Sequence, residues 1–190
     1  MTIDCHVHYF TGEYVQHLDH YVSSSDSSGY IRDVILPRIE GIRESRGLFE
    51  RYLSEAQRLG VKRSIIFGLA DTRFGCRDIN DEVAAVVAES PDRLLGFGSV
   101  PLSDAEAVIP EMERIRHQLG FRGIKIYPSM SGMHLNSEPV LEVLTRAAEL
   151  DLVVLTDCSF VCWESPHFFG AGNKFYHLLE ALGGLQERPR

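Results

Sequence analysis

The sequence predicts an α/β fold built around a parallel β-sheet. Short apolar runs, typical of buried strands, alternate five times with longer stretches whose apolar residues follow helical spacing. Strands that are joined by crossover helices lie parallel, and such crossovers are right-handed. The predicted strands are apolar on both faces, as in a sheet covered by helices. The pattern alone leaves two architectures open, a doubly wound open sheet and an incomplete (β/α) barrel.

The first predicted strand covers residues 2–8, with the sequence TIDCHVH. Its side chains alternate between two faces, and Asp4, His6 and His8 fall on the same one. A long connection follows over residues 9–46 and includes a serine-rich stretch. We expect this insertion to cover the mouth of the fold and to shape its specificity.

The remaining elements follow in alternation and form one predicted domain, residues 1–190. Four further apolar runs are predicted strands, at residues 63–69, 94–100, 123–127 and 152–157. Helical spacing predicts helices at residues 14–22, 47–60, 79–90, 103–119, 137–148 and 175–182.

Two helix starts carry recognisable capping signals. The helix over residues 103–119 begins at a predicted capping box, SDAE, that starts at Ser103. Pro110 either kinks this helix or marks a restart after one turn. Ser137 is predicted to cap the next helix, where Pro139 is tolerated in the first turn.

Composition and charge exclude several classes of protein. The 190 residues include 27 acidic and 19 basic ones, a formal net charge of −8, and 44% are hydrophobic. An acidic balance argues against nucleic-acid binding, which depends on clustered Lys and Arg. No apolar run approaches the roughly 18 residues of a membrane span, and no signal-peptide pattern is present. We therefore expect a cytoplasmic protein with a small-molecule substrate and with neither nucleic acid nor a membrane as partner.

Cysteines and glycine-rich loops add two further exclusions. Cys5, Cys76, Cys158 and Cys162 form no CxxC pair, so reduced thiols are expected rather than a disulfide framework. No GxGxxG or GxxxxGKS/T motif follows a predicted strand, which removes the usual nucleotide-binding signatures.

His6 and His8 give the sharpest chemical signal. Two residues apart on a strand, both imidazoles project from one face and are close enough to hold one metal ion. They also lie at the carboxyl end of the first strand, where parallel α/β proteins place their sites. The alternative is a pair of histidines satisfied within a core or a loop.

Several segments resemble the amidohydrolase superfamily. The opening IDCHVH is similar to its first strand, whose HxH binds a catalytic divalent metal ion. The segments NDEVAAVVAESPDRLLGFGSVPLSDAEAV, GFRGIKIYPS and AAELDLVVLTD resemble the amidohydrolase-related branch, which includes aminocarboxymuconate-semialdehyde decarboxylase and resorcylate decarboxylases. This resemblance implies a distorted (β/α)8 barrel and favours the barrel over the open sheet. It also implies a divalent ion, with Zn expected first and Mn or Fe as alternatives.

The resemblance assigns a role to Asp157. In this branch the fifth strand ends in a third metal-binding histidine, in a pattern such as LPVLIH, whereas this chain has LVVLTD. A carboxylate can ligate zinc, so we expect Asp157 to act as the third ligand and as a catalytic residue beside His6 and His8. The alternative is a helix-capping or solvent-facing aspartate.

Length sets a second difference from the family. A (β/α)8 barrel takes about 250 residues, and only five of the eight β/α units are predicted here. The family adds a histidine from the sixth strand and an aspartate, which accepts a proton, from the eighth. We therefore expect a C-terminally truncated barrel whose exposed strand edges could support a homo-oligomer.

Other polar residues are candidates for contact with substrate. Lys125 and Tyr127 share one face of the fourth predicted strand, and His134 follows that strand in a loop. Weaker candidates in the loops after the strands are Asp71, Arg73, Cys158, Trp163, His167, Phe168 and Phe169.

The sequence favours a metal-dependent hydrolase that acts on a small organic substrate, carboxylic or cyclic, through a metal-activated water. The first alternative is a metal-dependent decarboxylase, a carbon–carbon lyase of the same family. The second alternative is a non-catalytic fragment or a half-barrel that binds a partner.

Overall fold

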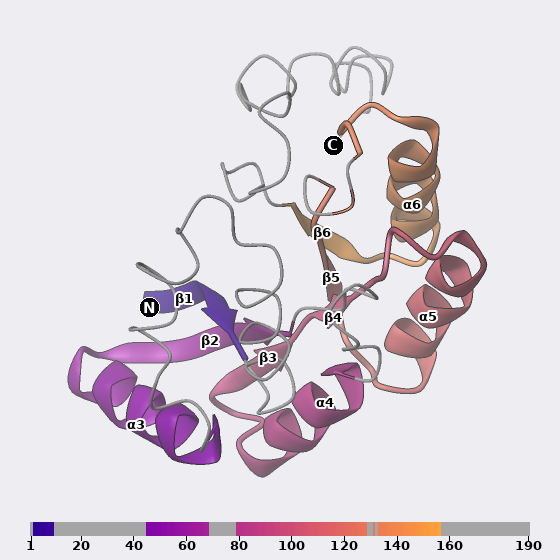
Figure 1. Ribbon diagram of the computed structural model, residues 1–190. Helices are drawn as coiled ribbons and strands as arrows, with labels where there is room; N and C mark the ends of the chain where they lie inside the picture. Colours follow the sequence, from indigo (N-terminus) through magenta and orange to yellow (C-terminus); the bar gives the residue numbers. More distant parts are fainter. Residues whose placement is uncertain (1, 10–44, 69–78, 129–130, 132, 157–190) are drawn as a thin grey trace, which may run out of the picture.

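Parallel strands form the centre of the protein (Figure 1). The computed structural model describes residues 2–9, 45–68, 79–128, 131 and 133–156. Within these ranges the strands form two three-stranded sheets, in the orders β1-β2-β3 and β4-β5-β6, and every pairing is parallel. The strands are β1 (Thr2–His8), β2 (Val61–Phe67), β3 (Leu94–Gly96), β4 (Gly98–Ser99), β5 (Gly123–Ile126) and β6 (Val153–Thr156).

The third predicted strand, residues 94–100, is wrong in its continuity, because the chain changes partners at Phe97. The Phe97 N–H still donates to the Ile66 carbonyl of β2, at 2.9 Å. At the next residue, Gly98, β4 begins and pairs with β5. The side chain of Asn80 bonds both the N–H and the carbonyl of Ser99, at 2.7 and 2.8 Å. Strand β3 therefore ends one sheet and β4 begins the next.

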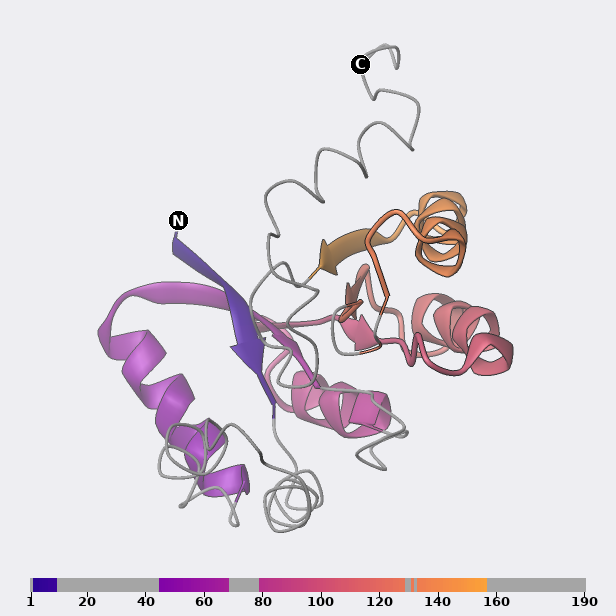
Figure 2. The same ribbon diagram turned by 45° about the horizontal axis from the view of Figure 1, so that its top comes forward.

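Within the described ranges, four helices cover the outer side of the strands. They are α3 (Ser45–Arg58), α4 (Ile79–Glu89), α5 (Ala105–His117) and α6 (Glu138–Glu149). Figures 1 and 2 show these helices arranged along one side of the strands, whereas a doubly wound sheet carries helices on both faces. The predicted α/β class with an incomplete barrel is confirmed for the described residues.

The hydrophobic core lies between the strands and this helical layer. Ile66 of β2 and Ile124 and Ile126 of β5 are fully buried, and they join Met112 of α5 and Val143 of α6 in one cluster. Because side chains alternate along a strand, the residues between these isoleucines point to the opposite, inner side of the barrel. Lys125, between Ile124 and Ile126, therefore points to the inner side, and so does Phe67, which follows Ile66.

Local capping differs in part from the prediction. The cap of α5 is Asp104 rather than Ser103, and its carboxylate accepts the Ala107 N–H at 3.3 Å. Helix α5 continues through Pro110 without a restart. Ser137 does precede α6, with Pro139 in the first turn, but its hydroxyl donates to the His134 carbonyl at 2.8 Å instead of capping the helix.

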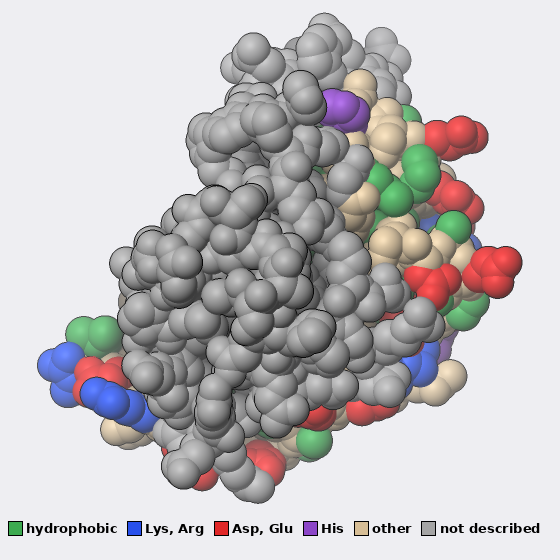
Figure 3. Space-filling view, in the orientation of Figure 1, with side chains coloured by type: hydrophobic (Ala, Val, Ile, Leu, Met, Phe, Trp, Pro, Cys, Tyr) green, Lys and Arg blue, Asp and Glu red, His purple; other side chains and the backbone are tan. Residues whose placement is uncertain are grey.

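Some expectations fall on residues that the structure does not describe. Most of the 9–46 insertion and the predicted helices at 14–22 and 175–182 lie outside the described residues. No helix in the described part of the chain is long and apolar enough to span a membrane. Acidic side chains gather along the edge of the molecule where α5 and α6 lie (Figure 3), consistent with the net charge of −8.

Candidate metal centre

The two histidines of β1 face each other at the carboxyl end of the strand. Their Nε2 atoms lie 3.0 Å apart, and their ring centroids are separated by 5.0 Å. Both rings meet Phe67 edge to face, with centroid distances of 5.2 Å for His6 and 4.9 Å for His8. The prediction that His6 and His8 share a face is confirmed.

This geometry fits a divalent metal ion. Zinc binds imidazole nitrogen at about 2.0–2.1 Å, and two nitrogens 3.0 Å apart can both reach one ion at such a distance. The angle between the two bonds would then be about 90°, which octahedral coordination requires. The donors fit as well, because Nε2 is one of the two ring nitrogens through which neutral imidazole binds metals.

Asp4 does not share the inner face with the histidines, so that part of the strand prediction is wrong. Its carboxylate turns to the outer side, where it accepts the phenol of Tyr52 on α3 at 3.0 Å. The hydroxyl of Ser64, which pairs with Asp4 in the sheet, lies 2.7 Å from the same phenol oxygen. An extra residue in β1 between Asp4 and Val7 breaks the alternation and separates Asp4 from His6 and His8.

Lys125 and Tyr127 lie on the inner side near the histidines. Lys125 is fully buried, and its Nζ lies 5.5 Å from the ring centroid of Phe67 and 4.9 Å from that of Tyr127. The rings of His8 and Tyr127 are 6.3 Å apart. Phe67 therefore connects the histidine pair with Lys125, and strands β1, β2 and β5 contribute to one inner cluster.

The other predicted site residues are not brought into this cluster by the described geometry. His134 is exposed in the turn that precedes α6. Asp157 lies outside the described residues, one position beyond the end of β6, where Thr156 pairs with Ile126. Among the residues that the structure describes, no group of three or more His, Cys, Asp or Glu side chains could hold a metal ion. The weaker candidates outside the described ranges are Asp71, Arg73, Cys158, Trp163, His167, Phe168 and Phe169.

Sequence reasoning missed two residues that shape the cluster. Phe67 pairs with His8 in parallel register, so its position on the inner face could have been inferred from strand alternation. Gly68 has no comparable sequence signal, although its carbonyl accepts the hydroxyl of Tyr127 at 3.3 Å and also the hydroxyl of Ser99. The first of these bonds holds the Tyr127 phenol against the end of β2.

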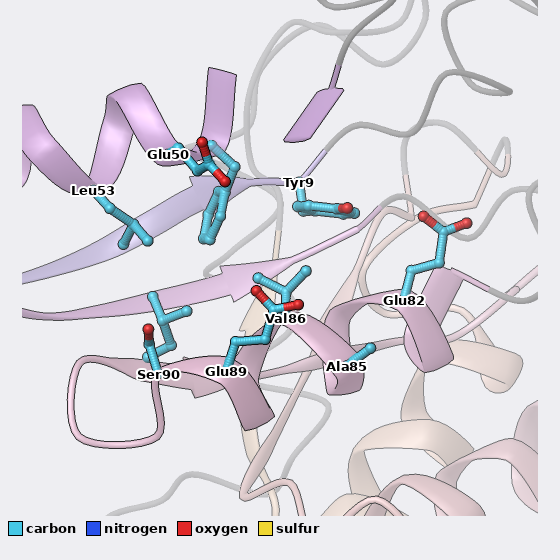
Figure 4. Close-up of a pocket in the computed structure, with 10 residues that line it drawn as sticks. Tyr9, Glu50, Leu53, Glu82, Ala85, Val86, Glu89 and Ser90 are labelled. Carbon is cyan, nitrogen blue, oxygen red and sulfur yellow. The ribbon is translucent and has the colours of Figure 1, made fainter. Parts of the chain in front are cut away.

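A separate pocket opens between helices α3 and α4. Its volume is about 200 Å³, and Figure 4 shows Glu50 on α3 and Glu82 and Glu89 on α4 around it, with Tyr9 and Leu53 among its apolar residues. Drug-sized ligands occupy pockets of about 300–1,000 Å³, and the inner-face residues His6, His8 and Lys125 do not line this one. It is therefore not the predicted site.

Comparison with known proteins decides the family. Residues 3–188 match the sequence profile of the family described as amidohydrolase. The chain belongs to the amidohydrolase family. The resemblance inferred from the sequence is thereby confirmed, because the matched region includes the HxH of β1 and the described elements from Ile3 onward.

Curated relatives of this amidohydrolase-family chain are named as decarboxylases. It is 33% identical over 76 residues to 2-amino-3-carboxymuconate-6-semialdehyde decarboxylase of Dictyostelium discoideum, a match that covers 40% of this chain and 21% of that protein. It is also 33% identical over 106 residues to gamma-resorcylate decarboxylase of Polaromonas sp., covering 52% of this chain and 32% of the relative.

Solved structures support the barrel. The 5-carboxyvanillate decarboxylase of Novosphingobium aromaticivorans, complexed with manganese and 4-hydroxy-3-methoxy-5-nitrobenzoic acid, matches with a TM-score of 0.67 and 23% identity over 81% of this chain and 49% of that one. A putative amidohydrolase from Staphylococcus aureus matches with a TM-score of 0.64 and 17% identity over 95% of this chain and 62% of that one. The likeness shows a shared barrel fold, and the chain spans 49% of the first structure and 62% of the second.

Proposed function

We propose that this chain supplies the HxH part of the metal site in a metal-dependent decarboxylase that acts on a small organic acid, of the hydroxybenzoate or carboxymuconate type. The observation that carries the proposal is the approach of the two Nε2 atoms of His6 and His8 to 3.0 Å at the carboxyl end of β1. The sequence alone favours hydrolysis. The named activities of the curated relatives instead support decarboxylation.

A divalent ion bound by His6 and His8 would supply a Lewis acid beside the substrate. Manganese is proposed alongside zinc, because solved relatives of the same fold hold manganese. Asp157 is proposed as the third ligand and as a catalytic residue, since it follows β6 directly and a carboxylate is a suitable ligand for either ion.

Lys125 is proposed to bind the carboxylate of the substrate. Its amine is buried on the inner face beside Phe67 and Tyr127, and charge attraction is strengthened where water is excluded. Tyr127 is proposed to orient the substrate, because the bond from its phenol to the Gly68 carbonyl fixes the ring. Phe67 would exclude water between the histidines and Lys125. His134, exposed before α6, keeps its predicted role in substrate contact at the mouth.

Metal analysis tests the first part of this proposal. Purified wild-type protein should carry near-stoichiometric Mn, Zn or Fe, and the double variant His6→Ala/His8→Ala should lose it. His117→Ala is the matched control, because His117 is an exposed histidine on α5 that pairs with Glu113 at 3.3 Å. Equal metal content in the double variant and the control would refute the metal site.

Product analysis tests the reaction. With gamma-resorcylate and 5-carboxyvanillate as probes, we expect CO₂ release by the wild-type protein and none by the double variant. Lys125→Met should raise KM for these acids while metal content is kept. Ester or amide cleavage without CO₂ release would support the hydrolase instead, and metal binding without either reaction would support a non-catalytic role for this chain.

A further inference from the structure

We propose that Asp4 is a positioning residue: it holds a bulge in β1 that turns His6 and His8 from the helix-facing side of the sheet to the inner side. The metal-binding half of this inference rests on the proposed function, whereas the strand geometry does not. The proposal assigns a task to a carboxylate that stands next to the histidine pair and is directed away from it.

The register of β1 against β2 locates the bulge. Asp4 pairs with Ser64 and Val7 pairs with Ile66, so three steps along β1 match two steps along β2. The extra residue lies within Cys5–His6, and His8 then pairs with Phe67. A one-residue insertion of this kind reverses which face each following side chain occupies.

The faces of β2 show what the extra residue changes. Ser64 and Ile66 point to the outer side, where Ser64 lies against Tyr52 of α3 and Ile66 is fully buried in the core cluster. Without the bulge, His6 would pair with Ile66, and both imidazoles would enter the apolar layer between sheet and helices. With the bulge, Val7 takes that place, 8% exposed and part of the core, and His6 and His8 face Phe67 on the inner side.

The carboxylate of Asp4 bonds both the bulge and the neighbouring helix α3. One oxygen accepts the backbone N–H of His6, at 3.2 Å, within the irregular segment itself. The other oxygen accepts a hydrogen bond from the Tyr52 hydroxyl, at 3.0 Å. The hydroxyl of Ser64, on the neighbouring strand β2, is hydrogen-bonded to the same Tyr52 hydroxyl. Asp4 therefore joins the bulge to α3 and β2, which fixes both its position and its direction.

Thiol labelling tests the strand geometry without any metal. A Val7→Cys variant places a thiol in the core, and mass spectrometry distinguishes its labelling from that of the exposed Cys5. In the otherwise wild-type chain the thiol at position 7 should be protected. With Asp4→Ala added, it should react about tenfold faster or more, because loss of the bulge moves position 7 to the other face.

Two further variants keep this test decisive. Asp4→Asn retains an oxygen for the His6 N–H, so the labelling rate at position 7 should stay close to that of the wild-type background. Tyr52→Phe removes only the phenolic hydroxyl and serves if Asp4→Ala does not fold. We expect a smaller rise in the labelling rate, about threefold, in the same direction. Protection of position 7 that is unchanged in both Asp4→Ala and Tyr52→Phe would overturn the proposal.

Manganese affinity, measured by titration calorimetry, tests the consequence for the site. Asp4→Ala should weaken Mn²⁺ binding by about 10- to 100-fold, as is common when a group that orients metal ligands is removed, and Asp4→Asn should restore most of it. Unchanged affinity in folded Asp4→Ala would refute the positioning role. If the wild-type chain binds no Mn²⁺ while labelling still responds to Asp4→Ala, the proposed function fails and the strand inference stands.

Discussion

Strands β1 and β5 both carry proposed site residues, but they are held in place by different forces. All four residues of β5 are buried, and the strand pairs without interruption with β4 on one side and β6 on the other. Strand β1 is mostly exposed or half-buried, pairs with β2 alone among the described strands, and contains register shifts. Apolar burial thus fixes Lys125 in β5, whereas polar bonds around Asp4 fix His6 and His8 in β1.

The same substitution in the two strands should therefore have very different effects. Ile124→Ala in β5 removes a fully buried side chain and should lower the free energy of unfolding by about 2–5 kcal/mol. Ile3→Ala in β1 is the matched control, because Ile3 is 42% exposed, and its effect should stay within about 0.5 kcal/mol. Urea unfolding of both variants checks this, and equal losses would contradict the contrast between the strands.

A smaller loss of free energy of unfolding is expected for an added methyl group at Gly123, where β5 leaves no room on its inner face. A methyl group at Gly123 would overlap the ring of Phe97, so Gly123→Ala should cost about 1–3 kcal/mol. Adding Phe97→Leu should recover part of that loss, since a smaller side chain gives the methyl group space. Urea unfolding of the single and double variants measures the coupling, and strictly additive losses would show that the ring is not the obstacle.

The smallest expected effect concerns the bonds around Asp4 and appears only at high pH. Burial raises the pKa of Tyr52 above its usual value; the hydrogen bond with Ser64 lowers it, and the bond to Asp4 and its negative charge raise it. Because the folded-state pKa is the higher one, the stabilisation is complete below about pH 10 and is lost as the pH rises through the folded-state pKa. Urea unfolding at pH 9 and pH 11 should show a steeper decline for wild type than for Tyr52→Phe. Parallel declines would contradict the raised pKa.

The residue pattern predicts β5 better than β1, because the pattern reflects burial and does not reveal a bulge. Residues 123–127 form an uninterrupted apolar run apart from Lys125, and the structure has β5 at Gly123–Ile126. In β1, alternation correctly paired His6 with His8 but placed Asp4 with them, because a bulge leaves no mark in a pattern of period two. The residue pattern does not reveal the break at Phe97 either. There the Asn80 side chain bonds the backbone of Ser99, 19 residues away, and such a contact leaves no mark in the local sequence.

The sequence by itself determined the α/β class, the order of the described strands and helices, the family and the histidine pair. The fold class, the element order and the histidine pair follow from local signals, namely hydrophobic periodicity, breaker residues and a short motif at a strand end. The family follows from the resemblance of several segments to known members. Only the tertiary structure decided that Asp4 faces α3, that Phe67 contacts both imidazoles, and that Lys125 is buried beside Tyr127. Each of these depends on register and packing between segments far apart in the chain, which the spacing of residues along the sequence does not specify.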